Sequence, residues 1–357
     1  MTEVRSDCFL SVRQISKRFG AQQALDAVDL ELGSDELLVI LGPTGAGKTT
    51  LLRTIAGLEE PDQGSIVMAG KDVTRLEPAE RDVALVFQNF SLYPSWTVRE
   101  NLEFPLRAPG RRLTESELRQ RIETVSELLK ITHLLGRAAA KLSGGEMQRV
   151  AIGRAIVRRP RLFLMDEPLT NLDAKLRESL RVELLELRRE LAIPMLFVTH
   201  DQAEALSMAD RIVVLAYGKV LQTGTPRAIY EQPLSPLVAL QVGQPAMNLV
   251  RVKLMGDAWV AADQTPLCRA ADIDASQVRE HPSQNAERLL GFRPEHVALF
   301  GGSTEAVIKV VEFVGASTTV LLTWAGQEVH AVTSGSSEVK PGDIVKPRID
   351  ASRALLF

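Results

Sequence analysis

Residues 41–52, LGPTGAGKTTLL, decide the fold of this chain. Within them, Gly42 to Thr49 fit the pattern G-x-x-x-x-G-K-T in full. The motif follows the apolar run Leu37 to Leu41 and precedes a helix-forming stretch, which is the context that it requires. Glycines let backbone N–H groups turn toward phosphate oxygens, and the next helix adds its positive end. The stretch therefore predicts a phosphate-binding loop in an α/β domain. A plain glycine-rich turn would not explain the Lys-Thr pair.

The residues of this loop have separate expected roles. Lys48 is predicted to bind the β- and γ-phosphates of a nucleotide, and Thr49 to bind Mg²⁺. The other loop residues are expected to surround the phosphates: Gly42, Pro43, Thr44, Gly45, Ala46, Gly47 and Thr50.

Composition limits the class of protein. The chain has 357 residues, 45% of them hydrophobic, which suits a large domain followed by a smaller one. Its net charge of -3 gives no support for a nucleic-acid binder. Cys8 and Cys268 are far apart in sequence, which suits a reducing compartment and argues against a disulfide framework. No apolar run approaches the roughly 20 residues that cross a bilayer. We expect a cytoplasmic protein whose membrane connection is made through partners.

Polar residues follow four apolar runs that read as buried strands. The runs are Leu37–Leu41, Val83–Phe87, Leu162–Met165 and Met195–Thr199, and they are followed by the phosphate-binding loop, Gln88, Asp166 with Glu167, and His200. The carboxyl ends of strands in an open parallel sheet are where ligands bind, so one shared site is predicted.

Each of these polar residues has a possible chemical role. Asp166 is the expected acidic partner for the metal, and Glu167 is the candidate that orients or deprotonates an attacking water. His200 could hydrogen-bond the γ-phosphate or the water, and Gln88 could contact metal and water together. Taken alone, His200 would be a structural residue and Gln88 weak evidence. Their common setting at strand ends supports the functional interpretation.

A second helix start suited to anions lies in LSGGEMQRVAIGRAIVRRP, residues 142–160. Ser143, Gly144 and Gly145 open this helix, and its first turn can bind an anion. A well-capped amphipathic helix is the alternative explanation. A chain that binds one nucleotide has little need of two such helix starts.

Helical and β patterns divide the chain. Thr114 with Glu117 forms a capping box, and leucines recur at helical spacing over 176–191. Prolines mark the region after Gly224, and short strand-like pieces such as Val307–Val314 and Thr318–Thr323 follow beyond residue 250. We predict an α/β domain over 1–240, with a helical part at about 89–160, and a β domain over 241–357.

Taken together, the motifs resemble those of ATP-binding cassette (ABC) ATPases. The phosphate-binding loop, Gln88, the signature at Leu142–Glu146, the acidic pair, NLD at 171–173 and His200 occur in that family's order. The resemblance implies an α/β P-loop NTPase fold and two cassettes that face head to tail. Each ATP would then lie between the loop of one cassette and the signature of the other, which explains the second anion site.

The resemblance also implies roles for single residues. Glu167 would be the catalytic carboxylate and His200 the switch histidine, while Asp173 would lie in the loop that crosses between subunits and also cap a helix. Phe19 stands where the family stacks a tyrosine or tryptophan on adenine. Ser143, Gly144, Gly145 and Glu146 would contact the second ATP, with Glu146 in a position where many relatives have glutamine.

The C-terminal third resembles the OB-like (TOBE) appendage of maltose-type and glycerol-3-phosphate-type importer ATPases, in GFRPEHVAL and PGDIVKPRIDASRALLF. The resemblance implies an ATPase at the cytoplasmic face of the membrane, paired with a copy of itself or a homologous ATPase. It would act with two transmembrane permeases and, indirectly, a solute-binding protein. The implied solute is a sugar, a polyol or glycerol 3-phosphate, with polyamine, iron and sulfate importers as alternatives. Phe90, Tyr93 and Trp96 would lie where a permease helix docks, unless they belong to an ordinary packed loop.

Other functions fit the sequence less well. A soluble cassette ATPase of DNA repair or translation would predict a long coiled-coil insertion or two cassettes in one chain, and this chain has neither. A small-molecule kinase would leave residues 142–146 unexplained. The β domain could receive a regulator or only hold the dimer, and the sequence does not distinguish these roles.

Overall fold

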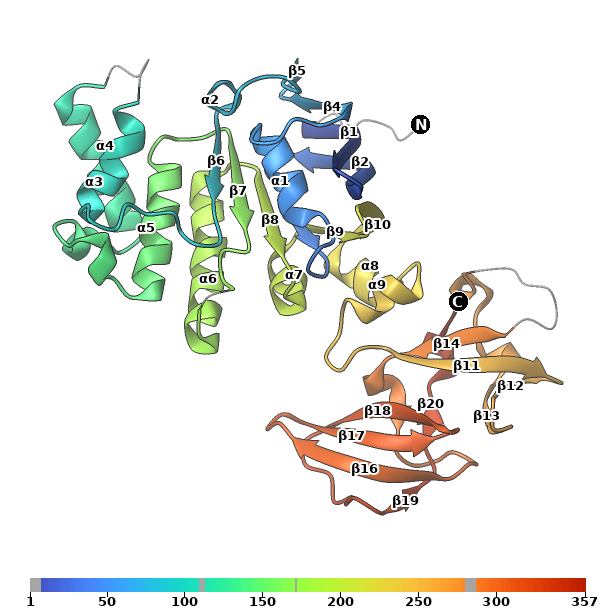
Figure 1. Ribbon diagram of the computed structural model, residues 1–357. Helices are drawn as coiled ribbons and strands as arrows, with labels where there is room; N and C mark the ends of the chain where they lie inside the picture. The colour runs from blue at the N-terminus through green and yellow to red at the C-terminus, as the bar shows by residue number, and fades with distance from the viewer. Residues whose placement is uncertain (1–7, 109–112, 171, 280–286) are drawn as a thin grey trace. The chain divides into compact units, whose positions relative to one another are not determined.

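The computed structural model describes residues 8–108, 113–170, 172–279 and 287–357. The chain divides into two compact units, Met1–Pro226 and Arg227–Phe357 (Figure 1). The first unit contains helices and strands, and the second consists mainly of strands. The predicted sequence of an α/β part followed by an all-β part is confirmed.

A six-stranded sheet forms the centre of the first unit. Its order is β10-β9-β3-β8-β7-β6, in which only the β10–β9 pair is antiparallel. The strands are β3 (Leu37–Leu41), β6 (Val83–Val86), β7 (Leu162–Asp166), β8 (Met195–Thr199), β9 (Arg211–Ala216) and β10 (Lys219–Gly224). All residues of β3, β7 and β8 are buried, because helices or a second sheet cover both faces. The four predicted buried strands are therefore confirmed, except that Phe87 lies just beyond β6.

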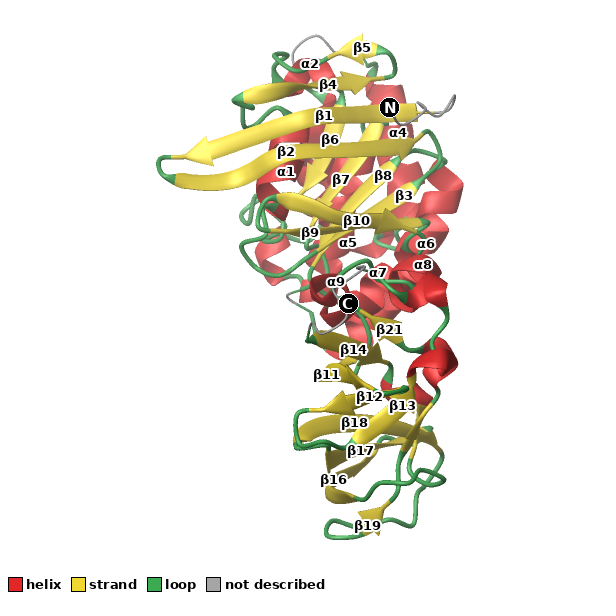
Figure 2. Cartoon of the chain, turned by 90° about the vertical axis from the view of Figure 1, so that its right-hand side faces the viewer, coloured by secondary structure: helices red, strands yellow, loops and turns green. Residues whose placement is uncertain are grey.

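A second, antiparallel sheet has the order β2-β1-β4-β5. Its strands are β1 (Cys8–Phe19), β2 (Gln22–Gly33), β4 (Gln63–Met68) and β5 (Lys71–Asp72). Helix α1 (Lys48–Ala56) lies between the two sheets, and its buried leucines join one hydrophobic core with both of them (Figures 1 and 2). This packing fixes the start of α1, and with it the phosphate-binding loop, above the ends of the parallel strands.

The remaining helices of the first unit are α2 (Pro78–Arg81), α3 (Val98–Glu103), α4 (Glu115–Leu128), α5 (Gly144–Ile156), α6 (Ala174–Leu191) and α7 (Gln202–Met208). The predicted capping box of Thr114 and Glu117 begins α4. The predicted leucine stripe lies on α6, where Leu180, Leu184 and Leu187 are buried. Helices α3, α4 and α5 gather at one end of the unit, beyond β6 (Figure 1). Across the described ranges, no helix combines the length and the apolar character that crossing a membrane requires.

The second unit consists of β-sheets that share a core of their own. Their orders are β13-β12-β11-β14-β21, β18-β17-β16-β19 and β15-β20. The strands are β11 (Asn248–Met255), β12 (Ala258–Ala261), β13 (Pro266–Arg269), β14 (Arg288–Phe292), β15 (Val297–Ala298), β16 (Ala306–Phe313), β17 (Ser317–Trp324), β18 (Gln327–Ser334), β19 (Ile344–Val345), β20 (Arg348–Ile349) and β21 (Leu355–Leu356). The two strand-like pieces predicted near residues 307 and 318 are β16 and β17.

Two short helices, α8 (Pro226–Glu231) and α9 (Pro236–Leu240), begin the second unit. The buried guanidinium of Arg293 holds this segment by donating to the carbonyl oxygens of Tyr230 and Val242, each at 2.6 Å, and of Ala239 at 3.3 Å. It also lies 4.0 Å from the centroid of the Tyr230 ring. The division between the compact units thus falls at the first residue of α8, and the domain boundary after residue 240 stays a prediction.

Candidate active site

A cleft of about 570 Å³ lies at the carboxyl edge of the parallel sheet. This volume falls in the usual range for small-molecule sites. The structure brings together in it most of the predicted residues: Phe19, Thr44 to Thr50, Gln88, Glu167 and His200. Gln22, Ala24 and Thr170 also line it, and the sequence had not marked these three as site residues.

Close packing explains why two loop positions are glycine. A Cβ atom at Gly42 would lie 2.1 Å from the carbonyl oxygen of Leu215. At Gly47 the backbone φ is +103° and a Cβ atom would lie 2.4 Å from the carbonyl oxygen of Ala24. Residues that carry a side chain rarely adopt such a φ. Both the lack of space and the backbone conformation therefore favour glycine at Gly47. The absence of a side chain at Gly42 and Gly47 lets the loop pack closely against β9 and β2.

Lys48 connects the loop with Glu167, the predicted catalytic carboxylate. Its buried ammonium donates hydrogen bonds to the carbonyl oxygens of Gly42, at 2.9 Å, and Pro43, at 3.0 Å. The same nitrogen lies 3.4 Å from a carboxylate oxygen of Glu167. Lys48 therefore places a positive charge inside the curve of the loop, where phosphate oxygens would be received.

Thr49 and Asp166 form the predicted metal pair. The Thr49 hydroxyl donates to an Asp166 carboxylate oxygen at 3.0 Å, although the two residues are far apart in sequence. Burial raises the pKa of Asp166, and the Thr49 hydrogen bond opposes that rise. Within the described ranges, no cluster of three or more His, Cys, Asp or Glu side chains is placed to hold a metal ion. This hydroxyl and carboxylate suit Mg²⁺, which commonly takes one or two protein oxygens and completes its shell with phosphate and water.

Glu167 and His200 meet in the same cleft. The Glu167 carboxylate lies 3.0 Å from Nδ1 of His200 and accepts a hydrogen bond from the Thr170 hydroxyl at 3.3 Å. The Glu167 backbone has φ of +46°, unusual for a side-chain-bearing residue, and its N–H donates to the carbonyl oxygen of Val198. The neighbouring strand thus holds a strained residue in place, as is common at functional sites.

The ring of Phe19 stands at the edge of the cleft. Its side chain is 47% exposed, and the Lys17 ammonium lies 5.4 Å from the ring centroid. An exposed aromatic ring at this position can stack on a base. The assignment of Phe19 to adenine stays a prediction, as does the role of Gln88 at the metal.

The predicted second anion site lies at the start of α5. The Ser143 hydroxyl accepts the N–H of Glu146, and the Glu146 carboxylate accepts the N–H of Ser143 at 2.7 Å. This hydrogen bond lowers the pKa of Glu146. Glu146 therefore completes a capping box here, a function that the residue's neighbours in sequence could have indicated.

Ser143 to Glu146 and Asp173 are not among the residues that line the cleft. Asp173 caps α6, because its carboxylate accepts the N–H of Leu176 at 3.0 Å, as the sequence predicted. Asn171, the first residue of NLD, lies outside the described residues. The predicted site residues thus form two groups in one chain, one in or directly beside the cleft and one at the starts of α5 and α6.

Comparison with known families agrees with this arrangement. Residues 25–170 match the model of the ABC transporter family, and residues 290–357 match that of the TOBE domain. The chain is 40% identical to the sulfoquinovosyl glycerol transport ATP-binding protein of Agrobacterium fabrum, over 98% of this chain and 97% of that protein. This chain belongs to the ABC transporter family. It is an ATP-binding, ATP-hydrolysing transporter ATPase with a C-terminal TOBE domain.

Further relatives support the assignment to this ABC family. The sn-glycerol-3-phosphate import ATP-binding protein of Cereibacter sphaeroides is 41% identical, over 98% of this chain and 97% of that protein. A solved ATP-binding cassette in its ADP conformation matches with a TM-score of 0.59 and 29% identity, over 65% of this chain and 98% of that one. That solved chain is an ATP-binding cassette, and its match to 65% of this chain agrees with a cassette fold for the first unit.

Thr170 offers a test of how Glu167 is held in this ABC ATPase. We expect Thr170→Ala to lower kcat for ATP hydrolysis about 2- to 12-fold with little change in KM, because one hydrogen bond contributes about 0.5–1.5 kcal/mol. Thr170→Ser keeps the hydroxyl and should retain most of the activity. Steady-state phosphate release measures both variants. Equal losses in the two would show that the hydroxyl does not act on Glu167.

Proposed function

We propose that this ABC ATPase is the energy-coupling subunit of an importer for a sugar, a polyol or glycerol 3-phosphate. The observation that supports this most is its identity of 40–41%, over nearly the full length, to the ATP-binding proteins of sulfoquinovosyl glycerol transport and sn-glycerol-3-phosphate import. Both solutes contain a glycerol group and carry a negative charge. Permeases and a binding protein would select the solute, since the cleft of this chain has the features of a nucleotide site.

Mg²⁺ is proposed as the metal that accompanies ATP, held by Thr49 and Asp166 with Gln88 nearby. When bound, the ion would neutralise charge on the β- and γ-phosphates. The protein's own residues then act on the reacting groups. Lys48 binds phosphate oxygens, Glu167 orients the attacking water and accepts its proton, and His200 hydrogen-bonds the γ-phosphate. The 3.0 Å contact of Glu167 with His200 lets the two side chains act on neighbouring atoms.

Two copies are proposed to close on two ATP molecules. The separation of the site residues into two groups supports this, because the helix start at Ser143 can bind an anion but does not line the cleft. In a head-to-tail dimer, Ser143 to Glu146 of one copy would complete the cleft of the other. ATP would then hold the two copies together, and hydrolysis would release them.

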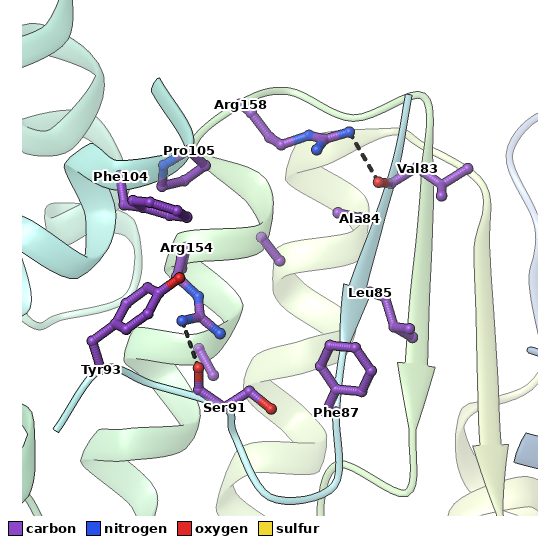
Figure 3. A pocket seen from close by; sticks show the side chains of 12 residues that line it. Val83, Ala84, Leu85, Phe87, Ser91, Tyr93, Phe104, Pro105, Arg154 and Arg158 are labelled. Carbon is purple, nitrogen blue, oxygen red and sulfur yellow. Dashed lines mark hydrogen bonds between the residues drawn. The ribbon is translucent and has the colours of Figure 1, made fainter. Parts of the chain in front are cut away.

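A groove beside β6 supports docking of the permeases. This groove has a volume of about 330 Å³, and Tyr93, Phe104 and Arg154 lie along it (Figure 3). The Tyr93 and Phe104 rings meet edge to face at 5.1 Å, and Trp96 stacks on Tyr93 at 4.3 Å. Tyr93 and Phe104 are partly exposed, so they can receive an apolar partner segment. Docking there would place the ATPase on the cytoplasmic face of the membrane.

The proposal is tested by purifying the tagged full-length chain from solubilised membranes of its source organism and identifying co-purifying proteins by mass spectrometry. Two polytopic permeases are expected. Uptake of labelled sn-glycerol 3-phosphate, maltose, spermidine and sulfate is then compared in cells with and without the gene. Loss of uptake of glycerol 3-phosphate or of the sugar supports the proposal. Loss of spermidine or sulfate uptake would assign the chain to those importers. Co-purification of ribosomal or repair proteins alone would overturn the transport role.

A further inference from the structure

Arg177, in the first turn of α6, connects two loops that the site uses. Its guanidinium donates a hydrogen bond to the carbonyl oxygen of Leu172 at 3.1 Å. It also donates to a carboxylate oxygen of Asp201 at 3.3 Å. Leu172 precedes Asp173, and Asp201 follows His200. One side chain therefore joins the loop before α6 to the loop that carries the switch histidine.

The loop around His200 is fixed on both sides of the histidine. The buried Thr199 hydroxyl donates to a Glu204 carboxylate oxygen at 2.6 Å and accepts the N–H of Asp201 at 2.9 Å. The other carboxylate oxygen of Asp201 caps α7 through the N–H groups of Ala203 and Glu204. Burial raises the pKa of Glu204. The Asp201 carboxylate thus has one oxygen for the helix cap and one for Arg177, so Arg177 bears directly on the residue next to His200.

The loop before α6 is in turn packed on the start of α5. A Cβ atom at Gly144 would lie 3.3 Å from Cδ2 of Leu172, and one at Gly145 would lie 2.8 Å from Cδ1 of Leu176. The signature glycines therefore lie against α6 and the residues before it. A continuous set of contacts runs from the signature through Leu172 and Arg177 to Asp201 and His200.

We propose that Arg177 is a positioning residue. It couples the position of the His200 side chain to the positions of the signature and of the loop before α6. The inference rests on the proposed head-to-tail dimer. There, the signature and Asp173 serve the ATP of the partner copy, while His200 serves the chain's own ATP. Arg177 then links the two ATP sites within one chain. The role is one of position, because Arg177 does not line the cleft itself.

The test compares Arg177→Met with Arg177→Lys in the full-length protein. Arg181→Met is the matched control, because Arg181 lies one turn along α6 and its ion pair is with Glu178 on the same helix. Two readouts are used. Steady-state ATP hydrolysis gives kcat and KM, and ¹H–¹⁵N spectra report the imidazole rings, with the His200 signal identified by its loss in His200→Gln. The chain has only five histidines, so the ring signals can be resolved.

In Arg177→Met, we expect kcat to fall about 10- to 100-fold with KM for ATP within about twofold, since misplacing a group that acts on the transition state has this effect. The His200 ring signal should move while the other histidine signals stay in place. Arg177→Lys should recover part of kcat, because an ammonium can keep one of the two contacts. Arg181→Met should match the wild type in both readouts.

An unchanged His200 signal in Arg177→Met would overturn the inference. So would movement of every histidine signal, because it would show general loss of structure. Failure of the dimer proposal has a different result. The Glu167→Gln protein, which otherwise carries the wild-type sequence, would then remain a monomer by light scattering with ATP, whatever the histidine spectra show.

Discussion

The Glu167→Gln protein is expected to bind ATP as the wild type does but to hydrolyse it about 10²- to 10⁴-fold more slowly, the usual contribution of a general base. Glutamine keeps the size of the side chain and the strained backbone at this position, whose N–H is held by Val198. It can still accept a hydrogen bond from Thr170, but it cannot take a proton from water. The charge that is lost lies 3.4 Å from Lys48 and would repel the γ-phosphate, so its loss does not weaken the binding of ATP.

This prediction is checked by titration of a fluorescent ATP analogue and by phosphate release in a single turnover. Glu178→Gln is the control, because that carboxylate is 75% exposed on α6 and has its ion pair with Arg181. It should hydrolyse ATP like the wild type. Turnover of Glu167→Gln within about threefold of the wild type would remove Glu167 from the role of base.

The Lys48→Ala protein is expected to lose about 10- to 100-fold in affinity for ATP. Charge-assisted hydrogen bonds of this kind contribute about 1.5–3 kcal/mol each. The buried ammonium also neutralises part of the Glu167 charge. Without it, that carboxylate and the phosphates repel each other across the cleft, so the change weakens binding through both effects.

Calorimetric titration with a non-hydrolysable ATP analogue measures this loss. Lys48 also donates hydrogen bonds to the carbonyl oxygens of Gly42 and Pro43, and Lys48→Ala removes them. The thermal unfolding of each variant is therefore measured together with its ATP binding. Lys71→Ala is the control, because Lys71 is exposed on the short strand β5. Binding by Lys48→Ala equal to that of Lys71→Ala, in a folded protein, would contradict the phosphate contact.

Much of the site could be predicted from local sequence because its parts are short motifs at the ends of apolar strands. A buried strand, a glycine loop and a Lys-Thr pair specify both a conformation and a chemistry. The same holds for Asp166 at the end of β7, for Glu167 directly after it, and for His200 after β8. Asp173 was predicted as a helix cap on the same kind of local evidence.

The contacts of three side chains were not predicted, because the direction of a side chain depends on the folded backbone. Thr170 is significant because its hydroxyl reaches Glu167, and nothing in PLT alone shows the direction of that side chain. In the sequence, Arg177 is one of several charged residues on an amphipathic helix, and only the folded structure shows that it lies beside Asp201. It was also not predicted that the Glu146 carboxylate closes the cap of its own helix, while its contact with a partner's ATP stays a prediction.

Reading the sequence was enough to predict the phosphate-binding loop, the order of the motifs, the buried strands and the change to a β domain. Each of these follows from residues close together in the chain, since local periodicity and turn chemistry specify strands, helices and caps. Tertiary structure alone decided which side chains meet. Packing of α1 between two sheets brings Thr49 to Asp166, and contacts of Arg293 assign α8 and α9 to the second unit. Such pairs are far apart in sequence, so only the folded chain brings them within hydrogen-bonding distance.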